Sequence, residues 1–546
     1  MSATTTKHVT VATPTDTEAS PSVPKRQRAG SIINDFCLTT SIQGFPGIAR
    51  SESIHNRLFW TVALISFTGI MLYFIVDAIS AYFNYPTQTS VTIVAEWPQA
   101  FPAVSICNYG MLRYDRFIGP FLNYTNALNI TNTTDTTNFT VTQSYYISDF
   151  LIDKFNRRES LNDYFFLLSG MMMSCSYNGV ACTAANFTSF ISPTYGMCYT
   201  FNANYNGVAC TAANFTSFIS PTYGMCNTFN AKLKNVVDGG IRYDSDNGAN
   251  GLLQLALYTH EQQYVPFMTQ GTGIVALVHD NSEVPNVEME AVFLSPGRHH
   301  RLGFKKKKSL FLASPYTTCT ETISPGLQIV YDAYNATDYA YSQYYCFDAC
   351  IQEYIYSHCG CGGPSLWNVP AVIIHGTDQR INISLCNTSN SCPKQYITFI
   401  LNTASTLNAY CSQCTEECTY TEFIMKLSSL LAPPVTALTD IKQFVESSNI
   451  TLSNDWSTSW ISEIQSNYVS LEVAYETVRT EVYSQEATLS PVDVLSNVGG
   501  QTGLWIGISF LSVIEIAEMA YRLMRCLWHN LRTIVNNRIK TQEAIQ

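Results

Sequence analysis

Two long apolar runs at opposite ends of the 546-residue chain constrain its fold more than any other feature. The first, Leu58–Val76, has nineteen residues without a charge, and a helix of this length nearly crosses the hydrocarbon layer of a bilayer. Because 57 residues precede it and no small-residue cleavage site follows, it predicts a retained membrane anchor rather than a signal peptide. A buried helix of a soluble protein is the alternative.

The second run, Gly503–Tyr521, is also apolar but contains two glutamates. Acidic residues inside a span are costly and usually face an aqueous path. On a single continuous helix, spacings of 3, 3, 3 and 4 place five residues in one polar stripe: Ser509, Ser512, Glu515, Glu518 and Arg522. Packing between helices is the alternative explanation, because small and hydroxyl residues also mediate contacts between spans.

Charges and glycosylation signals predict that both ends of the chain lie in the cytoplasm and that the protein is a multi-pass plasma-membrane protein. Basic residues precede the first span and follow the second, as the positive-inside rule requires: Lys25, Arg26, Arg28, Arg50 and Arg57, then Arg522, Arg525, Arg532, Arg538 and Lys540. All ten Asn-Xaa-Ser/Thr signals fall between the spans: Asn123, Asn129, Asn132, Asn138, Asn186, Asn214, Asn335, Asn382, Asn387 and Asn449.

Sixteen of the eighteen cysteines also lie between the spans, and only Cys37 and Cys526 lie outside. This distribution favours disulfides in an oxidising compartment. A zinc site at His358, Cys359 and Cys361 is the weaker alternative, and we expect no metal. A net charge of −11 argues against nucleic acid as a partner, because phosphate binding needs clustered cations.

These signals divide the chain into five parts: a cytoplasmic segment (1–56), a first span (57–82), a disulfide-rich, glycosylated α+β ectodomain (83–490), an outer pore with a second span (491–526) and a cytoplasmic tail (527–546). The first 50 residues, rich in Thr, Ser and Pro, are expected to be flexible. Strands are predicted at 90–97, 251–258, 273–279 and 468–483, and a helix at 341–357.

The ectodomain contains a near-exact tandem copy. Residues 177–203 recur at 205–231 with one change, Tyr199 becoming Asn227, so a recent duplication or a gene-model error fits better than an architectural repeat. The four lysines at 305–308 are expected in a solvated loop or on an edge strand. His299 and His300 are expected to be exposed in a turn.

No hydrolytic or phosphate-binding motif is present, so we expect neither an enzyme nor a bound cofactor.

Three motifs together give the chain its resemblance to a known family: FPAVSICN at 101–108, CSYNGVACTAANF followed by GMC and TFN, and GGQTGLWIGISFLSVIEI at 499–516. They resemble the degenerin/epithelial sodium channel superfamily, which includes acid-sensing and peptide-gated sodium channels, over residues 39–525. The resemblance implies an acid-sensing-channel-like fold with two transmembrane helices and a large disulfide-rich ectodomain.

The resemblance also implies a disulfide framework of fourteen cysteines. It pairs Cys319 with Cys418, Cys346 with Cys414, Cys350 with Cys411, Cys359 with Cys392 and Cys361 with Cys386. The duplication leaves alternatives, since Cys107 could reach Cys198 or Cys226, and Cys175 could pair with Cys182 or Cys210. If Cys107 takes Cys226 and Cys175 takes Cys182, then Cys198 and Cys210 can bond each other and no thiol is left over.

Positions in the spans acquire roles by the same resemblance. Gly507, Ile508 and Ser509 match the selectivity segment, with Ile508 in place of the commoner Ala, and Ser512, Glu515 and Glu518 would line the pore. Five residues match gating positions: Gln43 and Gly44 before the first span, where the family has His-Gly, Ser496 at the outer pore, and Tyr85 with Tyr316 at the joint between spans and ectodomain.

The expected function is a sodium-selective or cation-selective, amiloride-sensitive channel, a homotrimer or heterotrimer of related subunits. Opening is expected through the ectodomain, by a ligand or peptide rather than protons, because PTQTS follows Tyr85 where acid-sensing members have histidines. A mechanically gated or constitutively open channel, a non-conducting receptor or adhesion protein, and an ATP-gated trimeric channel of similar topology are the alternatives.

Overall fold

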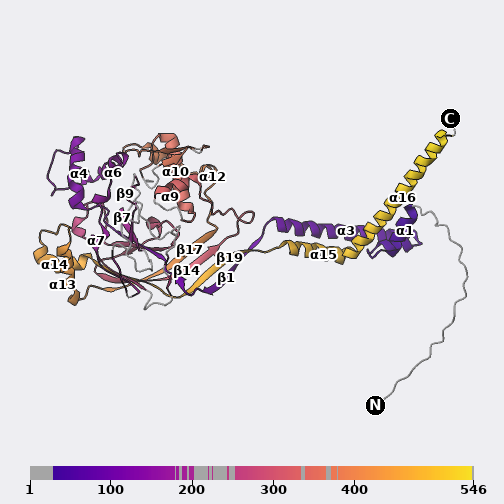
Figure 1. Cartoon of the computed structure of the whole chain (residues 1–546), viewed down its shortest axis with the longest axis horizontal. Helices are drawn as coiled ribbons and strands as arrows, with labels where there is room; N and C mark the ends of the chain where they lie inside the picture. Colours follow the sequence, from indigo (N-terminus) through magenta and orange to yellow (C-terminus); the bar gives the residue numbers. More distant parts are fainter. Residues whose placement is uncertain are drawn as a thin grey trace, which may run out of the picture. The chain divides into compact units, whose positions relative to one another are not determined.

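The computed structural model describes residues 29–543 except for 179, 184–186, 193–195, 202–218, 221–223, 226–240, 242, 245–251, 334–338, 365–370, 375 and 378. The chain forms two compact units (Figure 1). The membrane unit comprises the two ends of the chain, up to Pro86 and from Thr488 onward, and the ectodomain runs from Thr87 to Ala487.

The described part of the membrane unit consists of helices. They are α1 (Ala29–Thr39), α2 (Phe45–Arg50), α3 (Ile54–Phe83), α15 (Pro491–Ile506) and α16 (Phe510–Glu543). By length and apolar composition α3 alone could cross a membrane, whereas α15 and α16 qualify only as one span bent by 72°. Residues 29–39 and 45–50 are helical, so the prediction that the first 50 residues are flexible is wrong for this part.

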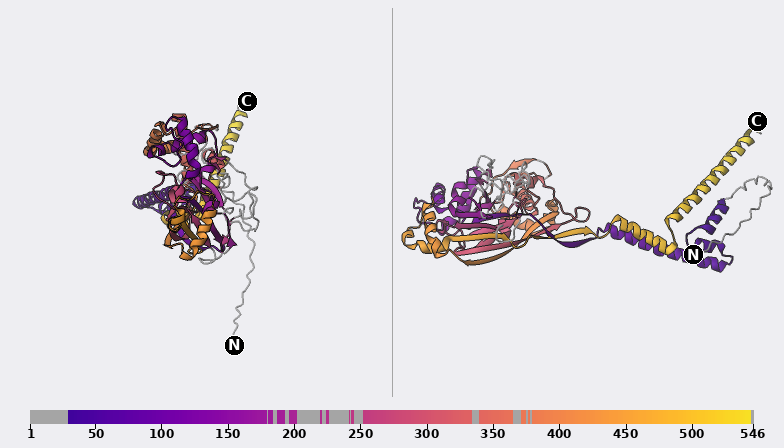
Figure 2. Two further views of the ribbon diagram at one scale, coloured as in Figure 1. Left: turned by 90° about the vertical axis from the view of Figure 1, so that its left-hand side faces the viewer. Right: turned by 60° about the horizontal axis from the view of Figure 1, so that its bottom comes forward.

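Helix α15 lies beside α3, and α16 turns away from both (Figure 2). Trp505 near the end of α15 stacks on Phe67 and Phe74 of α3, with ring centroids 6.0 Å apart in both pairs. The single continuous helix predicted for the second span is therefore wrong, because the chain breaks at residues 507–509. Helix α16 continues through residue 527 to Glu543, and the boundary between span and tail at that residue stays a prediction.

Within the described residues, the larger ectodomain sheet has eight strands. Seven follow the order β1 (Thr87–Ala95), β19 (Arg479–Ala487), β14 (Arg298–Leu310), β18 (Tyr468–Tyr475), β11 (Leu252–Tyr258), β4 (Met172–Tyr177) and β5 (Val180–Ala181), and β17 (Thr419–Leu431) pairs with β14. Since β17 occupies one edge of β14 throughout, β18 and β19 lie end to end along the other edge. The single strand predicted at 468–483 is thus two strands, broken at 476–478.

Side chains alternate across this sheet. Leu302 and Phe304 of β14 are buried in the core, whereas Arg301, which precedes Leu302, is exposed on the other face. The lysines at 305–308 continue β14 in the interior of the sheet, not in a loop or on an edge. His300 is buried in the same strand, so its predicted exposure in a turn is also wrong.

A second sheet, with five strands in the described part of the chain, packs into the same core. Its order is β13 (Val292–Leu294), β12 (Ile274–His279), β3 (Ala103–Asn108), β7 (Gly196–Phe201) and β6 (Phe187–Ser192). Every residue of β3 and β12 is buried. Two-stranded pairs add β2 (Gln99–Ala100) with β10 (Tyr243–Asp244), β8 (Ile219–Ser220) with β9 (Gly224–Met225), and β15 (Ala371–Ile373) with β16 (Arg380–Asn382).

Helices surround the sheets in separate groups, with α9, α10 and α12 in one place and α13 and α14 in another (Figure 1). The helices are α4 (Tyr114–Ala127), α5 (Val141–Ser144), α6 (Ile147–Asn156), α7 (Leu168–Met171), α8 (Val287–Glu290), α9 (Pro325–Ala333), α10 (Gln343–Cys359), α11 (Cys392–Asn402), α12 (Ala404–Tyr410), α13 (Leu438–Ser447) and α14 (Trp456–Asn467).

Disulfides hold the α10 group together. The structure joins Cys319 to Cys418, Cys346 to Cys414, Cys350 to Cys411, Cys359 to Cys392 and Cys361 to Cys386, the five pairs that the resemblance implied. Because both cysteines of the weighed zinc site are oxidised, that alternative is wrong. Of these five pairs, Cys319 and Cys418 close the longest loop, with a separation of 99 residues, and restrict the unfolded chain most in the chain-entropy account.

The duplicated segment carries the remaining pairings. Cys175 bonds to Cys182, as one of the two alternatives expected. Cys107 is also in a disulfide, and its backbone pairs with that of Cys198 in the register of β3 and β7. Cys210 and Cys226 lie outside the described residues, so the pairing of Cys107 with Cys226 stays a prediction.

Candidate ion pathway at the break in the second span

The break between α15 and α16 begins at a glycine in the left-handed region. Gly507 ends α15 and has a φ of +69°. A residue with a Cβ adopts this backbone conformation only at a cost in free energy. The Gly507 amide donates to the Gly503 carbonyl at 3.2 Å, and the Ile508 amide donates to that of Thr502 at 3.2 Å. The chain therefore leaves the helix with these two amides satisfied.

Two serines start the next helix. The Ser512 amide donates to Ser509 Oγ at 3.3 Å, and the Ser509 amide donates to Ser512 Oγ at 3.1 Å, which is reciprocal capping of a helix N-terminus. Ser512 is fully buried, whereas Ser509 is exposed and Ile508 is partly exposed. Of the predicted selectivity segment, only Ser509 thus presents an exposed side chain in the single chain.

The segment between α1 and α2, Thr40–Gln43, lies against this break. Three donors from it converge on one carboxylate oxygen, Glu515 Oε2: Thr40 Oγ1 at 2.9 Å, the Ser41 amide at 3.0 Å and Ser41 Oγ at 3.2 Å. Ser41 Oγ also lies 2.7 Å from Ser512 Oγ. Among the described residues none donates to the other oxygen, Oε1, which stays available to a cation or water.

Gln43 and Gly44 complete the contact. The Gln43 amide donates to the Ile506 carbonyl at 2.9 Å, which satisfies one of the last carbonyls of α15. A Cβ added to Gly507 would lie 2.9 Å from Gln43 Cγ. The two segments of the chain therefore approach each other so closely that only glycine fits at position 507. Gly44, with φ +98°, makes the turn into α2 beside Leu64 of α3.

Glu518 has a different surrounding. Arg522 donates to it at 2.6 Å and also reaches Asp35 of α1 at 3.4 Å. These groups border a hollow of about 290 Å³ that Glu515 shares, lined as well by Ile32, Phe36, Thr39, Thr40 and Met519. Glu518 is therefore compensated by a cation within the same chain, whereas Glu515 is held by neutral donors.

Thr40 and Ser41, which hold Glu515, were not predicted as site residues from the sequence. The available signal was three hydroxyl residues in a row, Thr39 to Ser41, just before the Gln-Gly pair.

The other predicted gating residues lie on other segments of the chain. Ser496 lies on an exposed part of α15. Tyr85 follows α3 with φ +49° and contacts the rings of Tyr82 and Phe83. Tyr316 belongs to the ectodomain, and its contact with Tyr85 stays a prediction.

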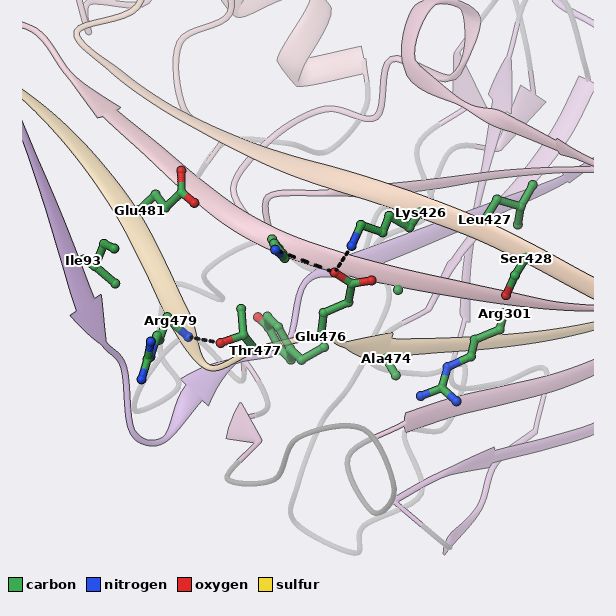
Figure 3. Close-up of a pocket in the computed structure, with 13 residues that line it drawn as sticks. Ile93, Arg301, Lys426, Leu427, Ser428, Ala474, Glu476, Thr477, Arg479 and Glu481 are labelled. Atoms are coloured by element: carbon green, nitrogen blue, oxygen red, sulfur yellow. Dashed lines mark hydrogen bonds and ion pairs between the residues drawn. The ribbon is translucent and has the colours of Figure 1, made fainter.

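The ectodomain has a hollow of about 950 Å³ where β18 gives way to β19, on the sheet face opposite the core (Figure 3). Glu476 lies at its centre, with Lys426 at 3.1 Å and Lys305 at 4.0 Å. Four cations line it against two carboxylates, namely Arg301, Lys305, Lys426 and Arg479 against Glu476 and Glu481. Within the described ranges, no group of three His, Cys, Asp or Glu could hold a metal ion.

Two buried histidines of the ectodomain, His260 and His279, stay neutral above pH 5. Burial lowers the pKa of His279 to about 4, and its ring bonds Ser105 Oγ at 2.9 Å and the Asp280 carbonyl at 3.0 Å. Burial likewise lowers the pKa of His260 to about 4. Neither ring changes charge near pH 6, where a histidine-based proton sensor must titrate.

One carboxyl group does titrate in the physiological range. Burial raises the pKa of Glu283 to about 8, and the negative charges of Glu290, Asp280 and Glu417 add to the effect. Folded protein therefore keeps this proton up to about pH 8, whereas unfolded chain releases it near pH 4.5. The contribution of Glu283 to the free energy of unfolding is therefore complete below about pH 4.5 and is lost as the pH rises toward 8.

We expect Glu283→Gln to raise the melting midpoint of the full-length protein by about 2 °C or more at pH 8.5, and to change it little at pH 5, because the amide cannot ionise. Differential scanning fluorimetry across this range measures the effect. Glu416→Gln, at an exposed position nearby, is the control and should leave the midpoint unchanged at both pH values. Equal midpoints of wild type and Glu283→Gln at pH 8.5 would contradict the assignment.

Sequence comparison places the chain in a family. The amiloride-sensitive sodium channel family matches residues 36–209 and 203–519. The chain is 24% identical to acid-sensing ion channel 1A of Danio rerio over 520 residues, which is 90% of this chain and 89% of that protein. It is 27% and 28% identical to epithelial sodium channel γ subunits of Pelodiscus sinensis and Bos taurus, over 67% and 66% of this chain and 48% of each relative.

The chain therefore belongs to the amiloride-sensitive sodium channel family, a family of membrane channels and not of enzymes. It spans most of the acid-sensing relative and about half the length of the γ subunits. Two candidate spans, 54–83 and 491–539, flank a disulfide-rich ectodomain of mixed α and β structure, as the sequence analysis predicted.

Proposed function

We propose that the chain is a subunit of a trimeric, amiloride-sensitive, sodium-selective or cation-selective channel of the plasma membrane, with both termini in the cytoplasm and a gate controlled by the ectodomain. The observation that carries the proposal is the break at Gly507–Ser509. At this break a left-handed glycine ends one helix, two serines start the next, and a polar segment packs against both. Such an interruption is costly inside a membrane unless it borders an aqueous path.

Assembly of three chains follows from the geometry of one. A single helix cannot enclose a path, but threefold symmetry would turn Glu515 into a ring of carboxylates that concentrates cations. The partly exposed position of Ile508, and the exposed Ser509 beside it, suit a narrow segment where backbone carbonyls and hydroxyls replace ion hydration. Related subunits could replace one or two copies in a heterotrimer.

The proposed stimulus is a ligand or peptide rather than protons. Support comes from the buried His260 and His279, whose pKa of about 4 leaves them neutral at the pH of acid gating. The basic hollow at the break between β18 and β19 gives a ligand with anionic groups a place in the sheet that continues into β1 and β19. Glu283 is the group through which a weaker pH dependence could arise.

Recording from oocytes that express the chain tests the proposal. Ser496→Phe should hold the outer pore open by steric wedging and give a sodium inward current that amiloride blocks, whereas the small Ser496→Ala should not. Surface biotinylation in the same cells confirms delivery. Silence of Ser496→Phe at normal surface levels would contradict the proposal and favour a non-conducting receptor or adhesion protein, which binds ligand without current.

A further inference from the structure

The distal half of α16 carries an exposed apolar stripe beyond the pore-lining residues. Seven large apolar side chains from Met524 to Ile539 are each 48–72% exposed: Met524, Leu527, Trp528, Leu531, Ile534, Val535 and Ile539. Their spacing of three and four residues places them along one side of the helix. A stripe of this size left in water would be a strong driver of association.

Basic side chains border the stripe along one edge. Arg525 and Arg532 lie next to it, with His529 beyond them, and no Asp or Glu occurs between Glu518 and Glu543, although the whole chain has a net charge of −11. Arg538 interrupts the stripe near its end, where a long side chain can extend to reach polar headgroups. Charge of one sign beside an apolar face is complementary to an anionic lipid surface.

The path of the second span brings this segment to the membrane surface. Trp505 stacks on Phe67, the middle residue of the apolar run Leu58–Val76, so the break after α15 lies near the middle of the hydrocarbon layer. From there α16, bent by 72° from α15 and about 51 Å long, advances only about 16 Å along the axis of α15, which is roughly half the hydrocarbon thickness. It would thus end near the interface rather than far into the cytoplasm.

The stripe is also continuous with the side of α16 opposite Glu515. Val513 and Phe510 lie on that side, exposed in the single chain, and the seven residues of the stripe follow them down the helix. The upper part of this apolar side faces lipid in the proposed channel. Because the stripe continues the same side without a break, lipid is the simplest partner for the stripe as well.

We propose that residues 524–539 of α16 form an amphipathic helix that lies in the cytoplasmic interface of the bilayer, with the stripe among acyl chains and its basic side on anionic lipid headgroups. The choice of leaflet rests on the proposed topology, but the binding does not depend on conduction. A test of lipid contact therefore stays separate from a test of the channel.

Spin labels on the full-length protein in nanodiscs test the proposal. Cys37 and Cys526, which form no disulfide, are replaced by serine, and a single cysteine is introduced as Leu531→Cys on the stripe or His529→Cys on the other side. In discs containing phosphatidylserine, the label at 531 should collide with oxygen and be protected from a water-soluble nickel complex. The label at 529 should show the reverse.

The charge contribution is tested on the same label. Arg525→Gln with Arg532→Gln should raise nickel collisions at position 531 roughly fivefold in discs with phosphatidylserine, and little in purely zwitterionic discs. Equal nickel access at 531 and 529 would mean a helix in water and overturn the proposal. Protection of 531 from both reagents, with spin–spin broadening, would mean that another copy covers the stripe and would overturn it too.

Discussion

Gly507→Ala should reduce the sodium current at least tenfold at unchanged surface expression. Alanine in the left-handed region costs about 1–2 kcal/mol, and its Cβ would lie 2.9 Å from Gln43 Cγ, so either the end of α15 or the segment 40–43 must move. A free-energy cost of about 1.4 kcal/mol lowers an equilibrium constant by a factor of ten. The cost of either movement is therefore large enough to depopulate the conducting conformation. Current per channel at the surface, in the Ser496→Phe background, is the measurement.

The control is a second glycine of the same helix. Gly503 lies inside α15, and the nearest atom to an added Cβ is the Ile508 carbonyl oxygen at 3.9 Å, so Gly503→Ala should leave the current nearly unchanged. Adding Gln43→Ala to Gly507→Ala removes the clashing Cγ and should restore part of the current, while the backbone cost remains. Equal currents from Gly507→Ala and Gly503→Ala would show that the break does not control conduction.

The large features of the fold could be predicted because their signals are local or compositional. A charge-free run of nineteen residues specifies a span by itself, and cysteines confined to the middle specify an oxidised domain. The strand at 273–279 was predictable for the same reason, since β12 is buried on both faces and consists of consecutive apolar residues up to His279.

Features that depend on distant partners were predicted wrongly. The lysines at 305–308 suggested a loop or edge, yet Lys306 pairs with Glu96 at 2.9 Å and Lys307 with Glu422 at 3.3 Å, both on other segments of the chain. His300 is buried because β14 lies between β17 and β18, where Ser429 and Leu471 are its partners in register. Nothing near these residues in the sequence indicates such partners.

The break in the second span had some local sequence signals but also depended on a distant partner. Apolar periodicity continues on both sides of Gly507, so a pattern of helical spacing predicts one helix through it. The local signals that end and restart helices were nevertheless present, namely Gly507 as a C-terminal glycine and Ser509 three residues before Ser512 as a cap. The segment that holds Glu515 could not be located from sequence, because 474 residues separate it from Ser41.

The second large effect concerns Glu515. Its position on α16, with one oxygen held by Thr40 and Ser41 and the other without a donor among the described residues, predicts a side chain that faces the ion path on the cytoplasmic side of the break. Ile514, the preceding residue, is 63% exposed in the single chain and points about 100° away around the helix, toward the predicted lipid side.

Thiol modification from the cytoplasmic side tests most directly whether three chains enclose a wet path beside this residue. In Ser496→Phe channels with Cys37 and Cys526 replaced by serine, a positively charged methanethiosulfonate reagent applied to inside-out patches should abolish the current of Glu515→Cys within seconds to minutes. The same reagent should leave Ile514→Cys unchanged. Block of Ile514→Cys with none of Glu515→Cys, or no effect on either, would contradict an ion path lined by Glu515.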